Sequence, residues 1–597
     1  MTETAISLAA AHRSGSQTLS ETIERTFQRI DAAADPAIFI SLRDKTNVLA
    51  EADALRTKDG AELPLYGVPV AVKDNIDVAE LPTTAACPAF IYRPAIDAAA
   101  VARLRAAGAL VIGKTNLDQF ATGLVGARSP YGTPRNALSA DLVPGGSSSG
   151  SAVAVARGIV PLALGTDTAG SGRVPAGLNN VVGLKPSLGL VSASGVVPAC
   201  RSLDTISVFA LTASDAFAAL EVIAGFDETD AFSRALRLGA MAALPTGLRV
   251  GIPRQDDRLF FGDANAETAF SDAMRRMEAI GATLVDTDLT PFFDTAKLLY
   301  HGPWIAERLA AVGDFIAKNP DAVHPITSTI ISQASTQSAA DAFKGLYRLR
   351  ELKREAYRRL AGIDVLMVPT MPLLVTLAEL EADPIGLNTQ LGTYTNFVNL
   401  LDLAGIAVPA AIAPDGRPFG ITLLAPAGRD AELASLGAAF HAATGLKLGG
   451  LGAPQPPLSL SALALRSGEI GIAVVGAHLS AMPLNHELQA LDARFLEEAT
   501  TAPDYRLFAI ESLSPAKPGL LRVAPGSGVP IAVEIWALRA AEFGRFIASV
   551  PPPLSIGTLT LSDGRQVKGF LGEAEALKDA RDISSFGGWR AYMASRI

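Results

Sequence analysis

Lysine and serine are the residue types through which this chain could carry out chemistry. Lys73 lies in VAVKDN, Ser147 in GGSSSGSA and Ser171 in GTDTAGSGRVPA. A serine hydroxyl attacks an amide carbonyl only if its proton is removed during the attack. A lysine can accept that proton when burial disfavours its ammonium form. The three motifs therefore indicate acyl transfer, in which the proton of one serine passes through a second serine to a neutral lysine.

Histidine, the usual base for a serine nucleophile, is absent from these motifs. All six histidines lie elsewhere, at His12, His301, His324, His441, His478 and His486. The reaction also needs backbone N–H groups aimed at the developing oxyanion, and small residues allow the sharp turn that presents them. We expect these donors at Thr168, Ala169, Gly170 and Ser171. Taken alone, a loop of this composition is more often a linker or an anion-binding turn.

A strand is predicted to carry Lys73 to the site. In YGVPVAVKD every second residue from 68 to 72 is valine, and this period of two predicts a strand that ends near Lys73. A helix is predicted over 97–107 with Asp97 as its N-cap, and ALVIG after it predicts another strand. The order strand, helix, strand predicts an α/β fold with helices on the faces of a sheet.

The length of 597 residues exceeds what one hydrophobic core supports, so at least two domains are expected. Residues 262–365 are predicted to be largely helical, because charge pairs alternate there with an apolar stripe. The run 447–461 is rich in Gly and Pro and is the expected linker. It would separate a first domain at 1–446 from a small α+β domain at 462–597.

Charge and cysteine content argue against several classes of protein. The net charge of -9 provides no basic surface for nucleic acid or for an anionic membrane. Two cysteines, Cys87 and Cys200, are too few for a disulfide framework or a Cys-rich zinc site, and they fit a reducing cytoplasm. The N-terminus lacks a basic n-region and the apolar runs are short, so we expect neither a signal peptide nor a membrane helix.

Three segments together, VAVKDN, PGGSSSGSAVAVA and LALGTDTAGSGRVPA, resemble the amidase signature family over about residues 1–440. The resemblance implies a mixed sheet covered by helices and no metal or organic cofactor. It also implies that Lys73 is the base and that Ser171 is the nucleophile. Ser147, which the family holds in a cis peptide, would pass the proton between them.

One position departs from many members of the family, which have glycine where this chain has Ala169. The methyl group leaves the backbone N–H of Ala169 intact, so oxyanion stabilisation should survive. The sequence leaves two roles open for Arg173: it orients Asp167 or the substrate, or it forms a structural ion pair.

The segments 116–136 and 298–315 resemble the allophanate hydrolases of that family. Allophanate is a small urea derivative with a terminal amide and a carboxylate, and its recognition needs a cation, ideally a planar fork. The resemblance implies that Tyr300 and Arg308 hold this substrate. Pro303 should begin a helix that carries Arg308 in its second turn and leaves Tyr300 on the preceding loop. Gly123 either brings backbone close to the ligand or is a plain turn glycine.

The same resemblance implies a reaction and its partners. Hydrolysis of the terminal amide would release ammonia and N-carboxycarbamate, which decarboxylates and yields further ammonia and carbon dioxide. A homodimer and a functional link to a urea carboxylase are implied as well. The alternative is another activity of the family, such as an aliphatic amidase or the glutamine-hydrolysing subunit of an amidotransferase.

The last domain resembles the gamma-glutamylcyclotransferase-like domain found at this position in allophanate hydrolases. Its polar candidates are His478, Asn485 and His486, around the loop at Gly476. No counterpart of the cyclotransferase glutamate is evident. Two roles stay open for this domain, namely promotion of the decarboxylation and interaction or dimerisation.

Overall fold

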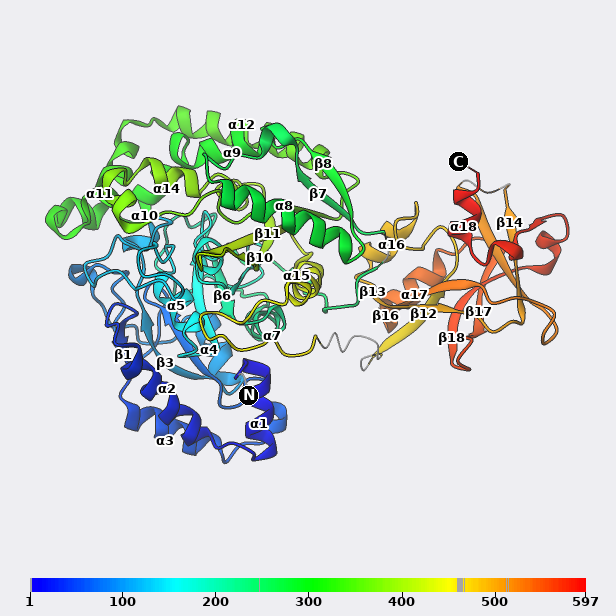
Figure 1. The fold of residues 1–597 in the computed structure, drawn as a ribbon, viewed down its shortest axis with the longest axis horizontal. Coiled ribbons are helices and arrows are strands. Elements are labelled where there is room, and N and C mark those ends of the chain that lie inside the picture. The colour runs from blue at the N-terminus through cyan, green and yellow to red at the C-terminus, as the bar shows by residue number, and fades with distance from the viewer. Residues whose placement is uncertain are drawn as a thin grey trace. The chain divides into compact units, whose positions relative to one another are not determined.

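The computed structural model describes residues 3–245, 247–458, 465, 468–511, 513 and 515–596. It divides into two compact units (Figure 1). The first comprises Met1–Leu238 and Arg249–Leu458, and the second comprises Gly239–Leu248 and Ser459–Ile597. The end of the predicted linker, 459–461, lies outside the described residues. The segment Gly239–Leu248 groups with the second unit although it precedes most of the first unit's helices, which no local pattern of the sequence indicates.

A mixed sheet of eleven strands forms the centre of the first unit. The strands are β1 (Phe39–Leu42), β2 (Pro69–Lys73), β3 (Leu110–Thr115), β4 (Leu162–Asp167), β5 (Val182–Lys185), β6 (Thr205–Ala210), β7 (Arg249–Pro253), β8 (Thr283–Thr287), β9 (Val365–Pro369), β10 (Leu403–Ile412) and β11 (Pro418–Pro426). Their order is β1-β3-β2-β4-β6-β5-β10-β11-β9-β7-β8. Strand β2 runs parallel to both β3 and β4. The carboxyl ends of these strands, at Lys73, Thr115 and Asp167, therefore lie at one edge of the sheet.

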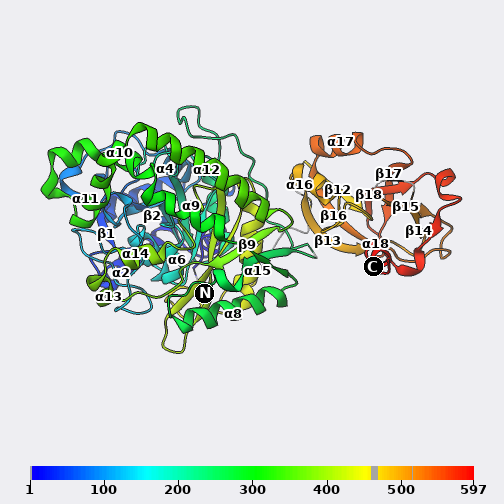
Figure 2. The same ribbon diagram turned by 90° about the horizontal axis from the view of Figure 1, so that it is seen from above.

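Helices surround this sheet (Figures 1 and 2). They are α1 (Ala5–Ser14), α2 (Leu19–Ala33), α3 (Lys45–Leu55), α4 (Ala99–Ala106), α5 (Ser149–Ala156), α6 (Val174–Leu178), α7 (Ala213–Ile223), α8 (Ala264–Ala279), α9 (Thr290–His301), α10 (Trp304–Lys318), α11 (Pro325–Ser332), α12 (Ala339–Leu360), α13 (Leu377–Ala382), α14 (Gly386–Leu391) and α15 (Asp430–Thr444). The small residues of α5 allow burial of the whole helix, since a Cβ on Gly150 would lie 2.3 Å from Ile38 O. The predicted α/β class is confirmed.

Two local predictions differ from the structure. Helix α4 begins at Ala99 with Ala98 as its N-cap, and the Asp97 carboxylate instead accepts a 2.8 Å hydrogen bond from the N–H of Ala79. The predicted N-cap was therefore wrong, because a partner distant in sequence competes for that side chain. Tyr300 lies in the last turn of α9 rather than on a loop. Arg308 occupies the second turn of α10, as expected.

The second unit has a sheet of five strands and a sheet of three. The strands are β12 (Glu469–Val474), β13 (Arg494–Thr500), β14 (Tyr505–Ile510), β15 (Lys517–Arg522), β16 (Ala532–Arg539), β17 (Leu554–Thr560), β18 (Gln566–Gly572) and β19 (Arg581–Asp582); the helices are α16 (Asn485–Ala490), α17 (Ala540–Ala548) and α18 (Trp589–Ala594). The larger sheet has the order β13-β16-β12-β18-β17. A separate core that includes Leu488, Trp536 and Phe570 holds the unit together, so the expected small α+β fold is confirmed.

Of the helices that the structure describes, none combines the length and the apolar character that crossing a lipid bilayer requires.

Candidate active site

Lys73 is buried at the end of β2 and contacts two hydroxyl groups. Its Nζ donates to Ser147 Oγ at 2.7 Å and to Thr166 Oγ1 at 2.8 Å. Burial lowers the pKa of Lys73 from its ordinary 10.5 to about 7, although nearby carboxylates raise it. The amine can therefore be neutral near neutral pH, which is the state that a general base requires.

The serine-rich loop that carries Ser147 is bound to the neighbouring strand ends. The Gly146–Ser147 peptide bond is cis, as the family resemblance implied. Ser147 O accepts a 3.1 Å hydrogen bond from the N–H of Asp118. The adjacent Ser148 Oγ donates to Thr166 O at 3.2 Å. Ser147 thus lies between the end of β4 and the segment that follows β3.

Ser171 stands in the turn between β4 and α6, and the Asp167 carboxylate organises this turn. Asp167 Oδ1 accepts from the N–H of Gly170 at 2.9 Å, and Oδ2 accepts from the N–H of Gly172 at 3.0 Å. Arg173 donates to the same carboxylate from Nε and Nη2 at 2.9 and 3.0 Å. Burial alone would raise the pKa of Asp167, but the Arg173 charge beside it keeps this pKa below its ordinary value. The structure therefore shows Arg173 in a buried ion pair that also orients Asp167, so these two of the roles left open for Arg173 occur together.

The expected oxyanion donors differ in their surroundings. Because the N–H of Gly170 donates to Asp167, it is already engaged. The oxyanion role then rests on Thr168, Ala169 and Ser171, which are almost fully buried. Thr168 Oγ1 donates to Asp204 Oδ1 at 2.5 Å, which fixes the start of the turn.

Of three carboxylates near Lys73, Asp118 and Asp204 were not singled out from the sequence, and Asp167 was named only as a partner of Arg173. Asp118, Asp204 and Asp167 all raise the pKa of Lys73, and so partly offset the effect of burial. Burial raises the pKa of Asp204 itself to about 6. The signal available in the sequence was a single acidic residue inside an apolar or glycine-rich motif, which also has purely structural explanations.

Arg308 and Tyr300 lie against each other. The Arg308 guanidinium carbon is 5.9 Å from the centre of the Tyr300 ring, and Nη1 donates to Thr122 Oγ1 at 3.1 Å. Arg308 is only 2% exposed and its Nε has no partner in the described chain. Its neighbour Glu307 accepts from the N–H and hydroxyl of Ser202 instead. Arg308 is therefore a buried residue and not the exposed partner of an ion pair with Glu307.

Gly123 follows Thr122 in a closely packed turn. A Cβ at Gly123 would lie 2.7 Å from Asp118 Oδ2 and 3.2 Å from Arg128 Nη1. Glycine is therefore required here by the carboxylate and guanidinium that surround it. Gly123 directly follows Thr122, whose hydroxyl accepts a hydrogen bond from Arg308.

A cavity of about 480 Å³ has Tyr300 and Arg128 in its wall, together with Asn388, Gly392 and Asn396. Tyr300 packs in the same apolar cluster as Ala169 of the nucleophile turn. A Cβ on Gly170 would lie 2.5 Å from Oγ1 of Thr395, the neighbour of Asn396. Two residues of the cavity wall therefore adjoin the turn that carries Ser171: Tyr300 through its cluster with Ala169, and Asn396 through its neighbour Thr395.

The three polar candidates of the second unit do not all converge. His478 Nε2 lies 2.8 Å from Glu487 Oε2, and its ring stacks on Phe570 with centroids 5.4 Å apart. Asn485 Nδ2 donates to His478 O at 2.9 Å. His486 is exposed and only its Nδ1 contacts Pro483 O. Burial lowers the pKa of His478, although Glu487 raises it in part.

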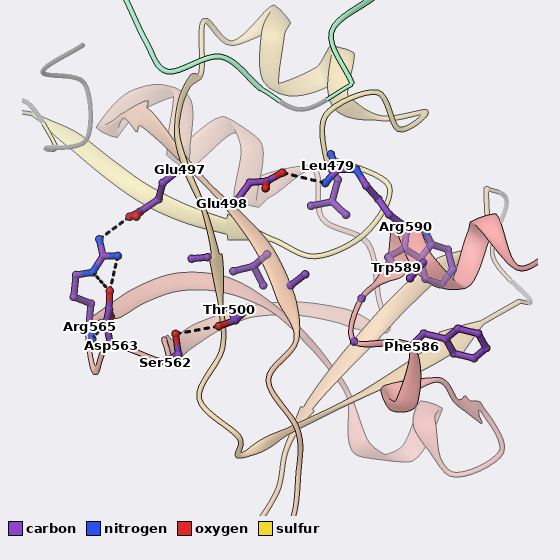
Figure 3. Close-up of a pocket in the computed structure, with 16 residues that line it drawn as sticks. Leu479, Glu497, Glu498, Thr500, Ser562, Asp563, Arg565, Phe586, Trp589 and Arg590 are labelled. Atoms are coloured by element: carbon purple, nitrogen blue, oxygen red, sulfur yellow. Dashed lines mark hydrogen bonds and ion pairs between the residues drawn. The ribbon is translucent and has the colours of Figure 1, made fainter. Parts of the chain in front are cut away.

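A pocket of about 650 Å³ lies beside the loop that follows His478 (Figure 3). Arg590 forms an ion pair with Glu498 at 3.8 Å on one side of the pocket, and Arg565 binds Glu497 on its other side. Behind Arg590, Glu534 is buried and accepts from the N–H and the hydroxyl of Ser480. Sequence reasoning found no candidate glutamate here. The only sequence signal for Glu534 was that it is the one acidic residue in the apolar run VPIAVEIWAL.

Among the residues that the structure describes, no three His, Cys, Asp or Glu side chains come together as metal ligands do. The site at Lys73 instead combines a buried amine, two serines and a turn rich in backbone donors.

Comparison with known proteins agrees with this chemistry. The model of the Amidase family matches residues 21–434, and the model of the allophanate hydrolase C-terminal domain matches residues 470–594. The chain belongs to the amidase family and is an amidohydrolase.

Individual relatives narrow the similarity. A urea amidolyase of Lachancea kluyveri is 44% identical over 94% of this chain, and the match spans 31% of that relative. A solved structure of Kluyveromyces lactis allophanate hydrolase is 42% identical, with a TM-score of 0.77 and 97% of both chains covered. A glutamyl-tRNA(Gln) amidotransferase subunit from Symbiobacterium thermophilum is 35% identical over 71% of this chain and 93% of its own length. The chain spans about a third of the length of its urea amidolyase relative, and it carries the two-domain arrangement of an allophanate hydrolase.

Proposed function

We propose that this chain hydrolyses allophanate. The observation that carries the proposal is the buried Lys73, whose Nζ lies 2.7 Å from Ser147 Oγ beside the turn of Ser171. The likeness to an allophanate hydrolase over both units supports the choice of substrate. The buried Arg308 beside Tyr300 supplies the planar cation that a carboxylate requires.

Each step then follows from the residues in place. Ser171 Oγ attacks the terminal amide carbon while its proton passes through Ser147 to the neutral Lys73. Backbone N–H groups of Thr168, Ala169 and Ser171 stabilise the oxyanion. The proton returns to the leaving nitrogen and ammonia departs. Water then hydrolyses the acyl-enzyme through the same residues, which releases N-carboxycarbamate and restores Ser171.

We propose for the second unit a part in the next step, the loss of carbon dioxide from N-carboxycarbamate. His478 and Asn485 are in contact and are its polar candidates, while His486 lies at the surface. Carbamate left by this step decays to ammonia and carbon dioxide. An interaction or dimerisation role for this unit is the alternative.

The rival function for the first unit is another amidase activity, on aliphatic amides or on glutamine. The similarity to the amidotransferase protein of Symbiobacterium thermophilum favours it. That similarity covers only 71% of the chain, however, whereas the allophanate hydrolase covers both units.

We propose further that the protein is a homodimer of the cytoplasm and acts after a urea carboxylase. Cys87 and Cys200 are unpaired and buried, which suits a reducing compartment. The urea amidolyase relative supports the link to urea degradation. Sedimentation of the purified chain at several concentrations tests the dimer.

Ammonia release from allophanate, measured beside malonamate, glutamine and a simple aliphatic amide, tests the main proposal. We expect a strong preference for allophanate. Equal or higher kcat/KM on glutamine or the aliphatic amide would retain the serine chemistry and refute the substrate.

A further inference from the structure

Arg128 has a buried side chain and lies in the wall of the 480 Å³ cavity. It is 3% exposed. Its Nη1 donates to Thr122 O at 3.1 Å and its Nη2 donates to Pro384 O at 2.8 Å. Its backbone is fixed too, because its N–H donates to Asp118 Oδ1 at 2.9 Å. The guanidinium is therefore held in one orientation while N–H donors remain for a ligand.

The charge of Arg128 is not neutralised by these contacts. Both acceptors of its guanidinium are neutral carbonyl oxygens, and within the described chain no carboxylate forms an ion pair with it. Asp118, the nearest acidic residue along its contacts, accepts from its backbone rather than from its side chain. A buried cation without a partner is costly, and an anionic ligand would relieve that cost.

Arg128 and Arg308 converge on one residue. Arg308 Nη1 donates to the hydroxyl of Thr122, and Arg128 Nη1 donates to the carbonyl of the same residue. Tyr300 lies against Arg308 and shares the cavity wall with Arg128. Arg128 thus lies in the cavity wall itself, Arg308 lies behind the Tyr300 of that wall, and both guanidinium groups donate to Thr122, which is a suitable arrangement for a carboxylate.

We propose that Arg128 is a second substrate-binding residue, which shares with Arg308 the carboxylate of a small anionic amide. This inference rests on the proposed function and adds a substrate class to it, namely short amides that bear a carboxylate close to the scissile carbonyl. Arg128 contributes specificity for charge, since a neutral amide of the same shape would leave both guanidinium groups unpaired.

Malonamate and malonamide provide the test, because they differ by a carboxylate against a second amide. Their affinities are measured by calorimetry on Ser171→Ala protein, with and without Arg128→Gln. We expect Arg128→Gln to weaken malonamate binding at least about 10-fold and malonamide binding less than about 2-fold. In the protein that retains Ser171, Arg128→Gln should raise KM for allophanate by a similar factor, with a smaller change in kcat.

Two further variants keep the outcome interpretable. Lys297→Gln removes a charge from the rim of the same cavity, where Lys297 is exposed and paired with Asp294, and should change malonamate binding less than about 2-fold. Arg128→Lys keeps the charge and loses the planar fork, so we expect an intermediate loss. Equal losses for both ligands in Arg128→Gln, or no preference for malonamate in the Ser171→Ala protein, overturn the inference. If the protein binds malonamate in preference to malonamide but does not hydrolyse allophanate, the proposed function is refuted and the inference about Arg128 is retained.

Discussion

Arg173 binds the Asp167 carboxylate through two hydrogen bonds, and the same carboxylate binds the backbone on both sides of Ser171. Arg173 and Asp167 have fully buried side chains. The ion pair thus acts on Ser171 indirectly, because it fixes the turn that carries this residue.

Replacement of Arg173 by Met should therefore affect both stability and rate. It leaves Asp167 buried without its cation, which is expected to lower the free energy of unfolding by about 3–5 kcal/mol. It should also lower kcat as the turn loses its orientation. Urea unfolding and steady-state kinetics measure the two effects. The control is Arg348→Gln, which breaks an exposed ion pair with Glu351 and should cost less than about 1 kcal/mol. Wild-type stability in Arg173→Met would contradict the prediction.

The second prediction concerns pH. Lys73 must be neutral to act as a base, and its pKa is lowered to about 7 by burial. We expect kcat/KM to rise as pH rises through about 7 and then to level off. Lys73→Met should lower kcat by about 10²–10⁴-fold. A profile that falls with rising pH across this range would show that the protonated lysine is the active form.

The lowered pKa of Lys73 also predicts how the free energy of unfolding changes with pH. The folded pKa of Lys73 is about 7 and its ordinary value is 10.5. Between these values the unfolded chain binds more protons than the folded chain, so this group makes the free energy of unfolding rise with pH. Lys73→Met should remove this contribution, which urea unfolding of the two proteins at pH 7 and pH 10 can measure.

Separate replacement of the two serines should distinguish their roles. Ser171→Ala removes the attacking oxygen and should abolish turnover at any substrate concentration, with no acyl-enzyme formed. Ser147→Ala keeps Ser171 and removes the hydroxyl that Lys73 contacts and that is proposed to pass the proton, so a reduced kcat with little change in KM is expected. Mass spectrometry after reaction with a serine-directed phosphonate should find the label on Ser171. Labelling of Ser147 instead would exchange the proposed roles.

Local motifs made part of this site predictable. The period of two predicted a strand end at Lys73, where β2 does end, whereas the roles of Lys73, Ser147 and Ser171 were predicted from the resemblance of their three motifs to the amidase signature family. The α/β class followed from the alternation of strand and helix patterns. These features depend on neighbours in sequence, which a single chain displays directly.

Contacts between distant segments were not predictable in the same way. Asp204 accepts from Thr168, and Arg128 donates to Pro384. Asp97 was predicted to cap a helix but binds the backbone of Ala79. A short polar side chain has several possible partners, and the tertiary fold decides among them. For this reason the carboxylates Asp118 and Asp204 near Lys73, and the contacts of both Arg128 and Arg308 with Thr122, became evident only in three dimensions.

Arg308→Gln should raise KM for allophanate by about 10–100-fold, since it removes the charge that binds the carboxylate and leaves kcat less affected. Lys318→Gln, at the exposed end of the same helix, is the control and should leave KM unchanged. An unchanged KM in Arg308→Gln would place the carboxylate elsewhere.

His478→Asn tests the decarboxylation role of the second unit. His478 is nearly buried between Phe570 and Phe546 and contacts Glu487. His486, which lies in α16, is exposed. If His478 promotes loss of carbon dioxide, His478→Asn should release the first ammonia at the normal rate and delay the second ammonia and the carbon dioxide. His486→Asn is the matched control and should release both ammonia molecules as the unmodified protein does. A melting curve verifies that His478→Asn still folds. Undelayed release of the second ammonia by the folded variant would leave interaction or dimerisation as the role of this unit, and sedimentation of the same protein would then decide whether the dimer depends on it.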